Sequence, residues 1–300
     1  MSAPAVAEHF HAYVADTTSA EPYPIFARMR DEAPCWWSDV LQTWVLSRWP
    51  DVSRMFEDGE HFVPLTGVPG TSSIFGRAIL QMSGDEHRRK AAILAKRLRS
   101  PKKLKGPLRD LIIELVHEGG DTLPLAPEVA DVRIGFTEPV PLGVIAELLD
   151  MAKAGDFRHW YGDIVAAGIS NVNQDPDVHA RGVKARDALF DFVTPTIAER
   201  RECPGDELLS DLCSMEFEGE RLSDDEVRSF SAFLLSAGIE TTDRGTASLI
   251  KELILNPDQW ARLKEDPSLV SSAVTESLRY RPPVQGTIRK VDRDFELHGQ

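Results

Sequence analysis

Two residues that can exchange protons stand side by side in the middle of the longest helical pattern of the chain. Glu240 and Thr241 lie in the segment AGIETT, within a run over 223–255 whose apolar residues recur at three- and four-residue spacing and predict a mostly buried helix. Adjacent acid and alcohol groups form a plausible proton relay. Gly238 costs about 1 kcal/mol relative to alanine in a helix interior, and a buried acid costs more unless it is paired. Because function usually compensates such a broken local rule, we expect a functional site here.

The same residues permit a second interpretation. Gly238 is also typical of a helix end, and Thr241, Thr242 and Asp243 could then open the next helix. Spacing alone does not decide between one helix and two.

The start of this pattern carries its own signal. Ser223 and Glu226 have the spacing of a capping box, and Asp224 and Asp225 suit the positive end of a helix dipole. The two aspartates could instead be metal ligands of an all-α cyclase. We reject that hypothesis because the first turn of a capped helix explains them and no second metal motif is found.

Two motifs in order make the chain resemble a known family. Residues 237–241 resemble the (A/G)Gx(D/E)T signature of the distal helix of the cytochrome P-450 family. Glu276 to Arg279 resemble its ExxR motif, followed by RYRPPV, and Arg289 stands ahead of DFELHG as that family's next strand would have it. The resemblance extends from Glu21 to Gln300. It implies a mainly α fold with small β-sheets, here a single domain over 1–300.

The resemblance also implies a cofactor, haem b, and roles for residues around it. Small side chains at Ala237 and Gly238 would let the helix cross the flat ring closely. Thr241 would donate to iron-bound dioxygen or hold a water beside it, and Glu240 would relay protons from solvent. The family reaction implied is insertion of one oxygen atom of O2 into a small hydrophobic organic substrate, with electrons from a ferredoxin-type or flavin-type donor.

Further residues are implied to hold the haem or its surroundings. His87 and Arg289 match positions that bind haem propionates, although position 91, where the family commonly has an arginine, is alanine. Glu276 and Arg279 share a helix face, where a surface pair contributes ~0.2–0.5 kcal/mol. If the pair is buried it is structural, and breaking it could cost ~3–5 kcal/mol.

A long segment without a period covers 61–80 and predicts a loop. Long loops in compact domains are usually functional. In the family the corresponding loop caps the substrate pocket, so Val63, Leu65, Ile74 and Phe75 are candidate pocket residues. The alternative is an ordinary surface loop.

The cysteines do not provide the expected iron ligand. The family's iron is held by a thiolate from a glycine-rich loop that follows the strand beginning near Arg289, and the sequence ends at Gln300, so we expect the chain to be C-terminally incomplete and inactive by itself. Cys35, Cys203 and Cys213 have no metal spacing and are predicted to be small buried hydrophobic residues. The alternative to a monooxygenase is therefore a haem-free, inactive or truncated member of the fold that acts as a binding or interaction protein.

Composition narrows the class of protein further. The net charge is −14, which disfavours nucleic acid as a partner. One basic tract, from His87 to Arg109, opposes this balance and could dock an acidic redox partner through Arg88, Arg89, Lys90, Lys96, Arg97, Lys102 and Lys103, or be a merely solvated face. No signal peptide or membrane span is recognised, so we expect a soluble, cytoplasmic protein.

Local patterns predict several other elements. These are a helix over 21–34, a hairpin over 35–48, a helix from Trp49 with Pro50 in its first turn, a helix ended by Gly119 and Gly120, a kink or break at Pro195, and a helix beginning at Pro257 with Asn256 as its N-cap.

Overall fold

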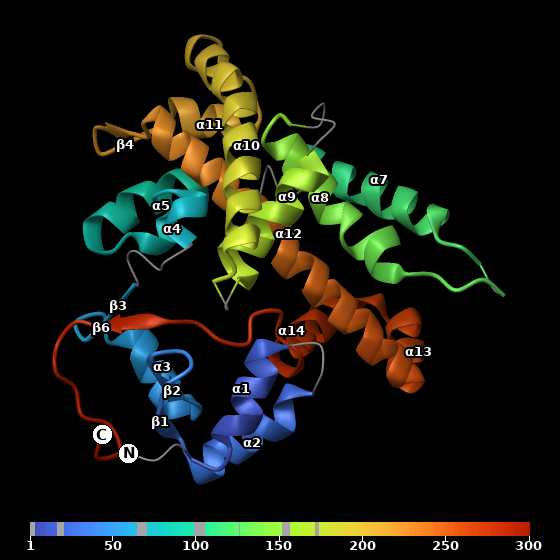
Figure 1. Ribbon diagram of the computed structural model, residues 1–300. Coiled ribbons are helices and arrows are strands. Elements are labelled where there is room, and N and C mark those ends of the chain that lie inside the picture. Colours follow the sequence, from blue (N-terminus) through green and yellow to red (C-terminus); the bar gives the residue numbers. More distant parts are fainter. Residues whose placement is uncertain are drawn as a thin grey trace. The chain divides into compact units, whose positions relative to one another are not determined.

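The computed structural model describes residues 4–16, 21–64, 71–98, 106–125, 127–151, 157–171 and 174–300. In these ranges the chain is mainly helical, and its strands pair as three two-stranded antiparallel sheets (Figure 1). This confirms the prediction of a mainly α fold with small β-sheets. Within the same ranges, no helix has the length and apolar character needed to cross a membrane.

The chain packs as two units. Unit 1 takes residues 1–66, 171–175 and 288–300, and unit 2 takes 67–170 and 176–287. Unit 1 contains α1 (Ala7–Ala15), α2 (Pro22–Glu32), β1 (Cys35–Ser38), β2 (Thr43–Leu46), α3 (Trp49–Glu57), β3 (Phe62–Pro64) and β6 (Arg289–Val291).

Unit 1 is held by aromatic residues around two small sheets. β1 and β2 form the predicted hairpin, in which Cys35 lies opposite Leu46, and buried Trp36 packs edge-on against Phe10 at 5.8 Å between ring centroids. β3 pairs with β6, which comes from the other end of the sequence, and Phe62 of β3 packs against Phe295 at 4.9 Å. The predicted helices α2 and α3 are confirmed, with Pro50 in the first turn of α3.

Unit 2 contains most of the helices. They are α4 (Thr71–Phe75), the 3-10 turn η1 (Ile79–Gln81), α5 (Gly84–Leu98), α7 (Pro107–Thr122), the π-helical turn η2 (Arg133–Thr137), α8 (Pro139–Leu148), α9 (Phe157–Val165), the π-helical turn η3 (Ala166–Ser170), α10 (Pro176–Glu202), α11 (Leu208–Ser214), α12 (Asp224–Leu255), α13 (Pro257–Glu265), the 3-10 turn η4 (Pro267–Leu269) and α14 (Val270–Tyr280). The short strands β4 (Glu216–Phe217) and β5 (Glu220–Arg221) form a hairpin before α12.

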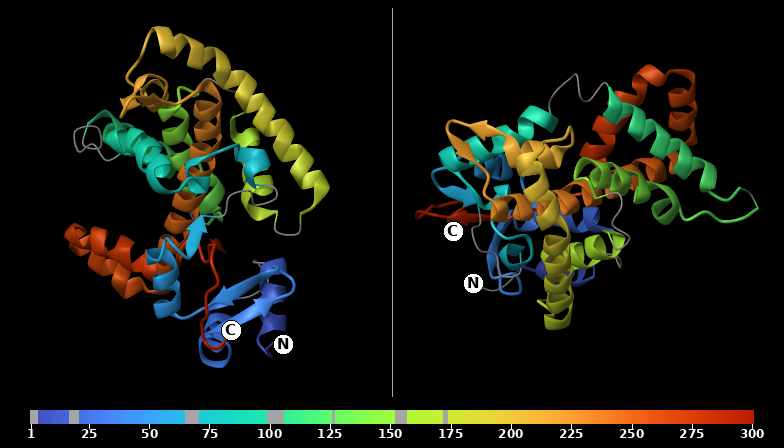
Figure 2. Two further views of the ribbon diagram at one scale, coloured as in Figure 1. Left: turned by 90° about the vertical axis from the view of Figure 1, so that its left-hand side faces the viewer. Right: turned by 90° about the horizontal axis from the view of Figure 1, so that it is seen from above.

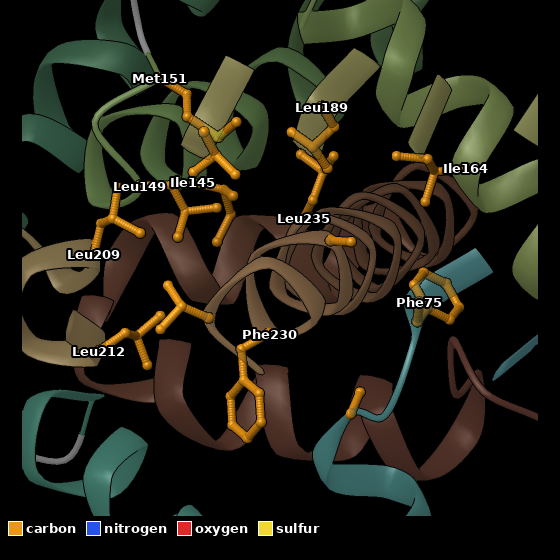
Figure 3. Packing of buried hydrophobic residues seen from close by; sticks show 14 of the residues in the cluster. Phe75, Ile145, Leu149, Met151, Ile164, Leu189, Leu209, Leu212, Phe230 and Leu235 are labelled. Carbon is orange, nitrogen blue, oxygen red and sulfur yellow. The ribbon is translucent and has the colours of Figure 1, made fainter. Parts of the chain in front are cut away.

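Helix α12 is the axis of the core of unit 2. α8, α9, α10, η2 and α14 all pack against it, and α10 lies across it in the views of Figures 1 and 2. Figure 3 shows Ile145 of α8, Leu189 of α10 and Ile164 of α9 around α12, which contributes Phe230 and Leu235. The buried residues of α12 lie between Val227 and Asp243, and burial of the apolar ones among them stabilises this helix although its centre is polar.

The start of α12 is capped as its sequence predicts. Ser223 Oγ accepts the Glu226 backbone N–H at 3.2 Å, and the Glu226 carboxylate accepts the Ser223 backbone N–H at 2.8 Å. The helix then runs without interruption through AGIETT to Leu255, so the interpretation with two helices is wrong. Gly238 is neither a break nor a cap. A β-carbon at this position would lie 2.4 Å from Ile145 Cδ1, so glycine lets α8 approach closely.

Other local predictions fail where tertiary contacts intervene. The predicted loop over 61–80 contains β3, α4 and η1. Pro195 does not break α10, which continues to Glu202, and α7 passes through Gly119 and Gly120 to Thr122. The helix α13 begins at Pro257 as predicted, but the Asn256 side chain donates to the Glu252 carbonyl of α12 at 2.8 Å and does not cap α13.

Candidate functional site

The middle of α12 presents two chemically different faces. Glu240 and Asp243 are buried on the face that meets α9 and η2, with Asp243 fully inaccessible to solvent. Ala237 and Thr241 are half-buried, and Thr242 is exposed. The acid and the alcohol that are adjacent in sequence therefore point to different surroundings, because neighbouring residues of a helix lie about 100° apart.

The Glu240 carboxylate is engaged at both oxygens. Tyr161 of α9 donates its hydroxyl to Oε2 at 2.7 Å, and Arg244, one turn further along α12, pairs with Oε1. Burial, and then the hydrogen bond to Glu240, raises the pKa of Tyr161 well above its ordinary value. Tyr161 therefore keeps its proton and remains a donor to the carboxylate.

Asp243 anchors α12 to the π-helical turn η2. Thr137 donates its hydroxyl to Oδ1 at 2.6 Å, and Arg133 Nε donates to Oδ2 at 2.9 Å. Burial acts to lower the pKa of Arg133, but the attraction of Asp243 and the hydrogen bond to it outweigh burial, so this pKa is raised. Every oxygen of this buried carboxylate is paired, which is the condition under which a buried charge is tolerated.

A second acid extends this arrangement toward the surface. Glu138 is buried between Arg133, at 3.4 Å, and Arg158 of α9, at 2.6 Å. Glu138 and Asp243 therefore share Arg133. Together with Tyr161, these ion pairs join η2 and α9 to the centre of α12.

Both threonine hydroxyls of AGIETT are already hydrogen-bonded. Thr241 donates to the Ala237 carbonyl at 2.8 Å and Thr242 to the Gly238 carbonyl at 3.0 Å, the ordinary back-bonding of threonine in helices. A hydroxyl has one proton, so Thr241 can accept a hydrogen bond in this state, but it must release Ala237 before it can donate to a ligand.

The motif Glu276 to Arg279 lies on α14 as an exposed pair. Arg279 donates to both carboxylate oxygens of Glu276 at 2.7 Å, and this hydrogen bond lowers the pKa of Glu276. Both side chains are more than half exposed. In this structure the pair is thus a surface pair on one helix face, and its structural role stays a prediction.

The predicted haem-binding residues other than Ala237 and Gly238 lie on separate elements. His87 is exposed on α5, with Ala91 one turn later. Arg289 lies in β6 of unit 1, where it donates to the Ile288 carbonyl at 3.0 Å and its guanidinium lies over the Phe56 ring at 5.0 Å. Their binding to haem propionates stays a prediction.

The predicted pocket residues have unlike surroundings. Val63 is half-buried in β3, and Leu65 lies outside the described residues. Ile74 and Phe75 of α4 are buried in the core of unit 2, where the Phe75 ring meets Phe233 of α12 edge-on at 6.2 Å.

Small residues make room for α4. A β-carbon on Gly168 of η3 would lie 2.6 Å from the Phe75 ring. One on Gly182 of α10 would lie 2.1 Å from Ala167 Cβ of η3 and 3.1 Å from Ile74 Cδ1. α4 is thus seated in notches on η3 and α10. Its burial, rather than its sequence pattern, accounts for a helix where a loop was predicted.

The cysteines do not fit as iron ligands. Cysteine binds a metal as the thiolate. Burial raises the pKa of Cys213 to about 11 and also raises the pKa of Cys35, so both remain thiols, while Cys203 is exposed at the end of α10. The prediction of buried cysteines is right for Cys213, wrong for exposed Cys203, and only partly right for Cys35, which is half-buried. Across the described ranges, no group of three or more His, Cys, Asp or Glu could hold a metal ion.

The fit to haem is therefore partial. Half-buried Ala237 and Thr241 present small side chains along one side of α12, which suits the broad face of a flat ring. Gly238 contributes less than predicted, because the space above it is taken by Ile145. No donor set for the iron is found among the residues that the structure describes.

Among the basic residues named for docking, the three whose side chains the structure describes, Arg88, Arg89 and Lys90, form ion pairs within the protein. Arg88 pairs with Glu218 at 2.7 Å, Arg89 with Glu220 at 3.1 Å, and buried Lys90 with Glu226 at 2.9 Å. These contacts join α5 to the β4–β5 hairpin and to the start of α12. The side chains of Lys96 and Arg97, and all of Lys102 and Lys103, lie outside the described residues.

Several residues of this site are not identified by the sequence. Tyr161, Thr137 and Arg133 are distant in the chain and belong to no motif. Arg244 could have been found, because a Glu four residues before an Arg is a recognised helix pair.

Comparisons with known proteins agree on one family. The cytochrome P450 family model matches residues 169–300. Pulcherriminic acid synthase of Bacillus subtilis (strain 168) is 29% identical over 293 residues, which cover 95% of this chain and 70% of that protein. Cytochrome P450 107B1 of Saccharopolyspora erythraea is 30% identical over 293 residues, covering 91% of this chain and 69% of that protein.

A solved structure shows the same fold. The ligand-free cytochrome P450 TbtJ1 superposes with a TM-score of 0.81 at 28% identity, covering 93% of this chain and 72% of that one. The chain thus spans about 70% of the length of the proteins it resembles.

Proposed function

The chain belongs to the cytochrome P450 family, and from this premise we propose that it serves a haem-dependent monooxygenase reaction on a small hydrophobic organic substrate. One oxygen atom of O2 enters the substrate, and the electrons come from a ferredoxin-type or flavin-type partner in the cytoplasm. The observation that carries the proposal is the centre of α12, where half-buried Thr241 follows a buried, fully paired Glu240.

When bound, haem supplies the iron at which dioxygen is activated. The residues of this chain that would hold it are Ala237 and Thr241, whose small side chains line one side of α12, with His87 and Arg289 as partners for the propionates. Val63, Leu65, Ile74 and Phe75 are proposed to contact or shape the substrate pocket. Glu276 and Arg279 are proposed to brace α14 beneath α12.

The protons of the reaction are proposed to pass through two side chains. Glu240 has one oxygen on the buried side, at Tyr161, and the other at Arg244, whose side chain is about half exposed. A proton from solvent would therefore enter at Oε1. Thr241 would then release the Ala237 carbonyl and donate its single hydroxyl proton, and the proton taken up at Glu240 would replace it on Thr241.

A second candidate is a haem-free binding protein of the same fold. It is favoured by the state of the cysteines, since Cys213 is a buried thiol and, among the residues that the structure describes, neither Cys35 nor Cys203 lies in a cluster of metal ligands. It would use the same helices as a scaffold without oxygen chemistry.

Haem titration of the protein separates the two candidates. Under the first, haem added to the purified protein binds at one equivalent, and Ala237→Leu weakens binding because a larger side chain blocks the ring. Ala198→Leu, an exposed position of α10, is the matched control and should bind as the wild type does. Absence of saturable haem binding, or equal binding by both variants, would favour the second candidate.

A further inference from the structure

Tyr161 is not part of any motif, yet it contacts the acid of the proposed relay. We propose that Tyr161 is a positioning residue for Glu240, and that the Glu240 carboxylate has two positions, one held by Tyr161 on the α9 side and one held by Ser236 within α12. The inference rests on the proposed function only in that Glu240 is taken as the relay acid.

The first position is the one seen in the structure. The Tyr161 hydroxyl and the Glu240 carboxylate meet at 2.7 Å, with both residues buried. Because Tyr161 holds its proton strongly, it donates throughout the range in which proteins work. Because both residues are buried, this contact defines the direction of the side chain more firmly than an exposed ion pair would.

The contact of Arg244 with the other oxygen, Oε1, fixes the direction of the Glu240 side chain less firmly. Arg244 carries a side chain that is 54% exposed, so water and salt compete for its contact with Oε1. Arg244 is also on the same helix as Glu240 and moves with it. Tyr161, in contrast, belongs to α9, so displacement of α9 relative to α12 changes what the carboxylate can reach.

Ser236 provides the second position. It lies one turn before Glu240 on the same face of α12, is 1% exposed, and its hydroxyl has no hydrogen-bond partner in the structure. Buried hydroxyls are nearly always paired, and a serine in a helix ordinarily bonds to the carbonyl four residues before it, as Ser231 does with Val227 at 2.8 Å. The Ser236 hydroxyl is therefore a free donor one turn from the Glu240 carboxylate, and it could hold the carboxylate in a second position.

The helix itself stays in place while the carboxylate moves. Asp243, three residues after Glu240, is held by Thr137 and Arg133 of η2, and neither of these residues contacts Glu240 through a hydrogen bond in the described structure. Loss of the Tyr161 hydroxyl should thus release the Glu240 side chain and leave the backbone of α12 anchored. Thr137 offers a matched control, because its hydroxyl is equally buried and also donates to a carboxylate of α12.

The test reads the carboxylate directly. In the infrared difference spectrum between the protein and its Glu240→Gln variant, the antisymmetric carboxylate stretch of Glu240 is isolated. We expect Tyr161→Phe to shift this band, Ser236→Ala added to Tyr161→Phe to shift it again, and Thr137→Val to leave it unchanged. An unshifted band in Tyr161→Phe, with a loss of stability equal to that of Thr137→Val, would show that Tyr161 only packs.

A reciprocal measurement keeps the inference testable if Tyr161→Phe does not fold. Glu240→Gln should shift the phenol C–O stretch of one tyrosine in the infrared spectrum, because the Tyr161 hydroxyl loses the carboxylate to which it donates at 2.7 Å. Tyr280→Phe, at an exposed position, is the control for losing an unrelated hydroxyl. No change in the tyrosine band of Glu240→Gln would overturn the contact.

These readouts are independent of turnover. If Glu240→Gln leaves oxygen chemistry unaffected but Tyr161→Phe shifts the band, the relay is wrong and the positioning is right. If the Glu240 band does not shift in Tyr161→Phe but Glu240→Gln abolishes the coupling of oxygen consumption to product, Glu240 is the relay acid and Tyr161 does not position it. An unchanged band after adding Ser236→Ala would remove the second position alone.

Discussion

Gly238 of α12 lies so close to Ile145 of α8 that a β-carbon on the glycine would come within 2.4 Å of the Ile145 Cδ1 atom. The glycine of the AGIETT segment is therefore explained first by helix packing. Ala237 next to it is half-buried and is left as the small residue proposed to face the haem.

Gly238→Ala should be stabilising or destabilising according to what stands at position 145. Overpacking costs ~1–3 kcal/mol, and the gain in helix propensity is about 1 kcal/mol. We expect a net loss of up to ~2 kcal/mol in the wild type, and a net gain in the Ile145→Ala background, which lacks both Cδ1 and the Cγ1 atom that lies 2.9 Å from the added β-carbon. Chemical denaturation of the four proteins in this double-mutant cycle measures the coupling, and additive effects would show that the two residues do not compete for space.

The capping box of α12 should make stability depend on pH. Burial acts to raise the pKa of Glu226, but the Ser223 backbone N–H and Lys90 outweigh it, so this pKa is lowered in the folded protein. Because the pKa is lower in the folded state, ionised Glu226 stabilises the folded protein at pH values above its unfolded pKa of about 4.3. This stabilisation is lost as the pH falls through the folded pKa.

Glu226→Gln should remove this acid-dependent part of the free energy of unfolding. Ser223→Ala, which costs about 1 kcal/mol as a lost cap, should retain the part due to Lys90. Denaturation between pH 3 and 7 distinguishes them. Parallel curves for the wild type and Glu226→Gln would mean that Glu226 titrates alike in the folded and unfolded states.

The seat of Phe75 should be sensitive to a single methyl group. Gly168→Ala places a β-carbon 2.6 Å from the ring, which should cost ~1–3 kcal/mol and displace Phe75. If Phe75 shapes the substrate pocket, the substrate dissociation constant changes as well. Gly162→Ala, in the same stretch but with no atom within 4 Å of its added β-carbon, is the control. Equal stability of Gly168→Ala and Gly162→Ala would show that Phe75 does not pack closely against Gly168.

Thr241 is expected to matter for proton delivery rather than for folding. In the haem-loaded enzyme, Thr241→Ala should leave substrate binding intact while oxygen consumption outruns product and peroxide appears, because the only hydroxyl proton at this position is gone. Thr241→Ser keeps the proton and should restore coupling in large part. Thr242→Ala, at an exposed neighbour with the same back-bond, is the control. Unchanged coupling in Thr241→Ala would remove the residue from the reaction.

Features encoded by nearby residues could be predicted from the sequence, and features made by distant ones could not. The cap of α12 and the β1–β2 hairpin follow from a few consecutive residues and are confirmed. α4 was missed because its five residues have no period of their own and are stabilised by burial of Ile74 and Phe75.

The candidate site divides in the same way. Glu240 and Thr241 stand out because they violate a pattern, and the back-bonding of Thr241 is the ordinary behaviour of threonine in a helix. Tyr161 is separated from Glu240 by 79 positions, so only the packing of α9 on α12 brings them together. Cys203 was assigned to the interior by residue type, but it follows the charged end of α10 and is exposed.

Helix α10 continues through Pro195, and this continuity has a mechanical consequence. A proline has no N–H, so the carbonyl of Asp191 lacks the helical partner that position 195 would supply, and α10 has one hydrogen bond fewer to resist bending there. The part before this point holds η3 and α4 through Gly182, whereas the part after it is tied to α11 and the start of α12 through Arg201, which bonds to the Cys213 carbonyl and to Asp224. α10 therefore has a compliant point in its last third, and bending at this point would change the position of the part that packs on η3 and α4 relative to the part that is tied to α11 and α12.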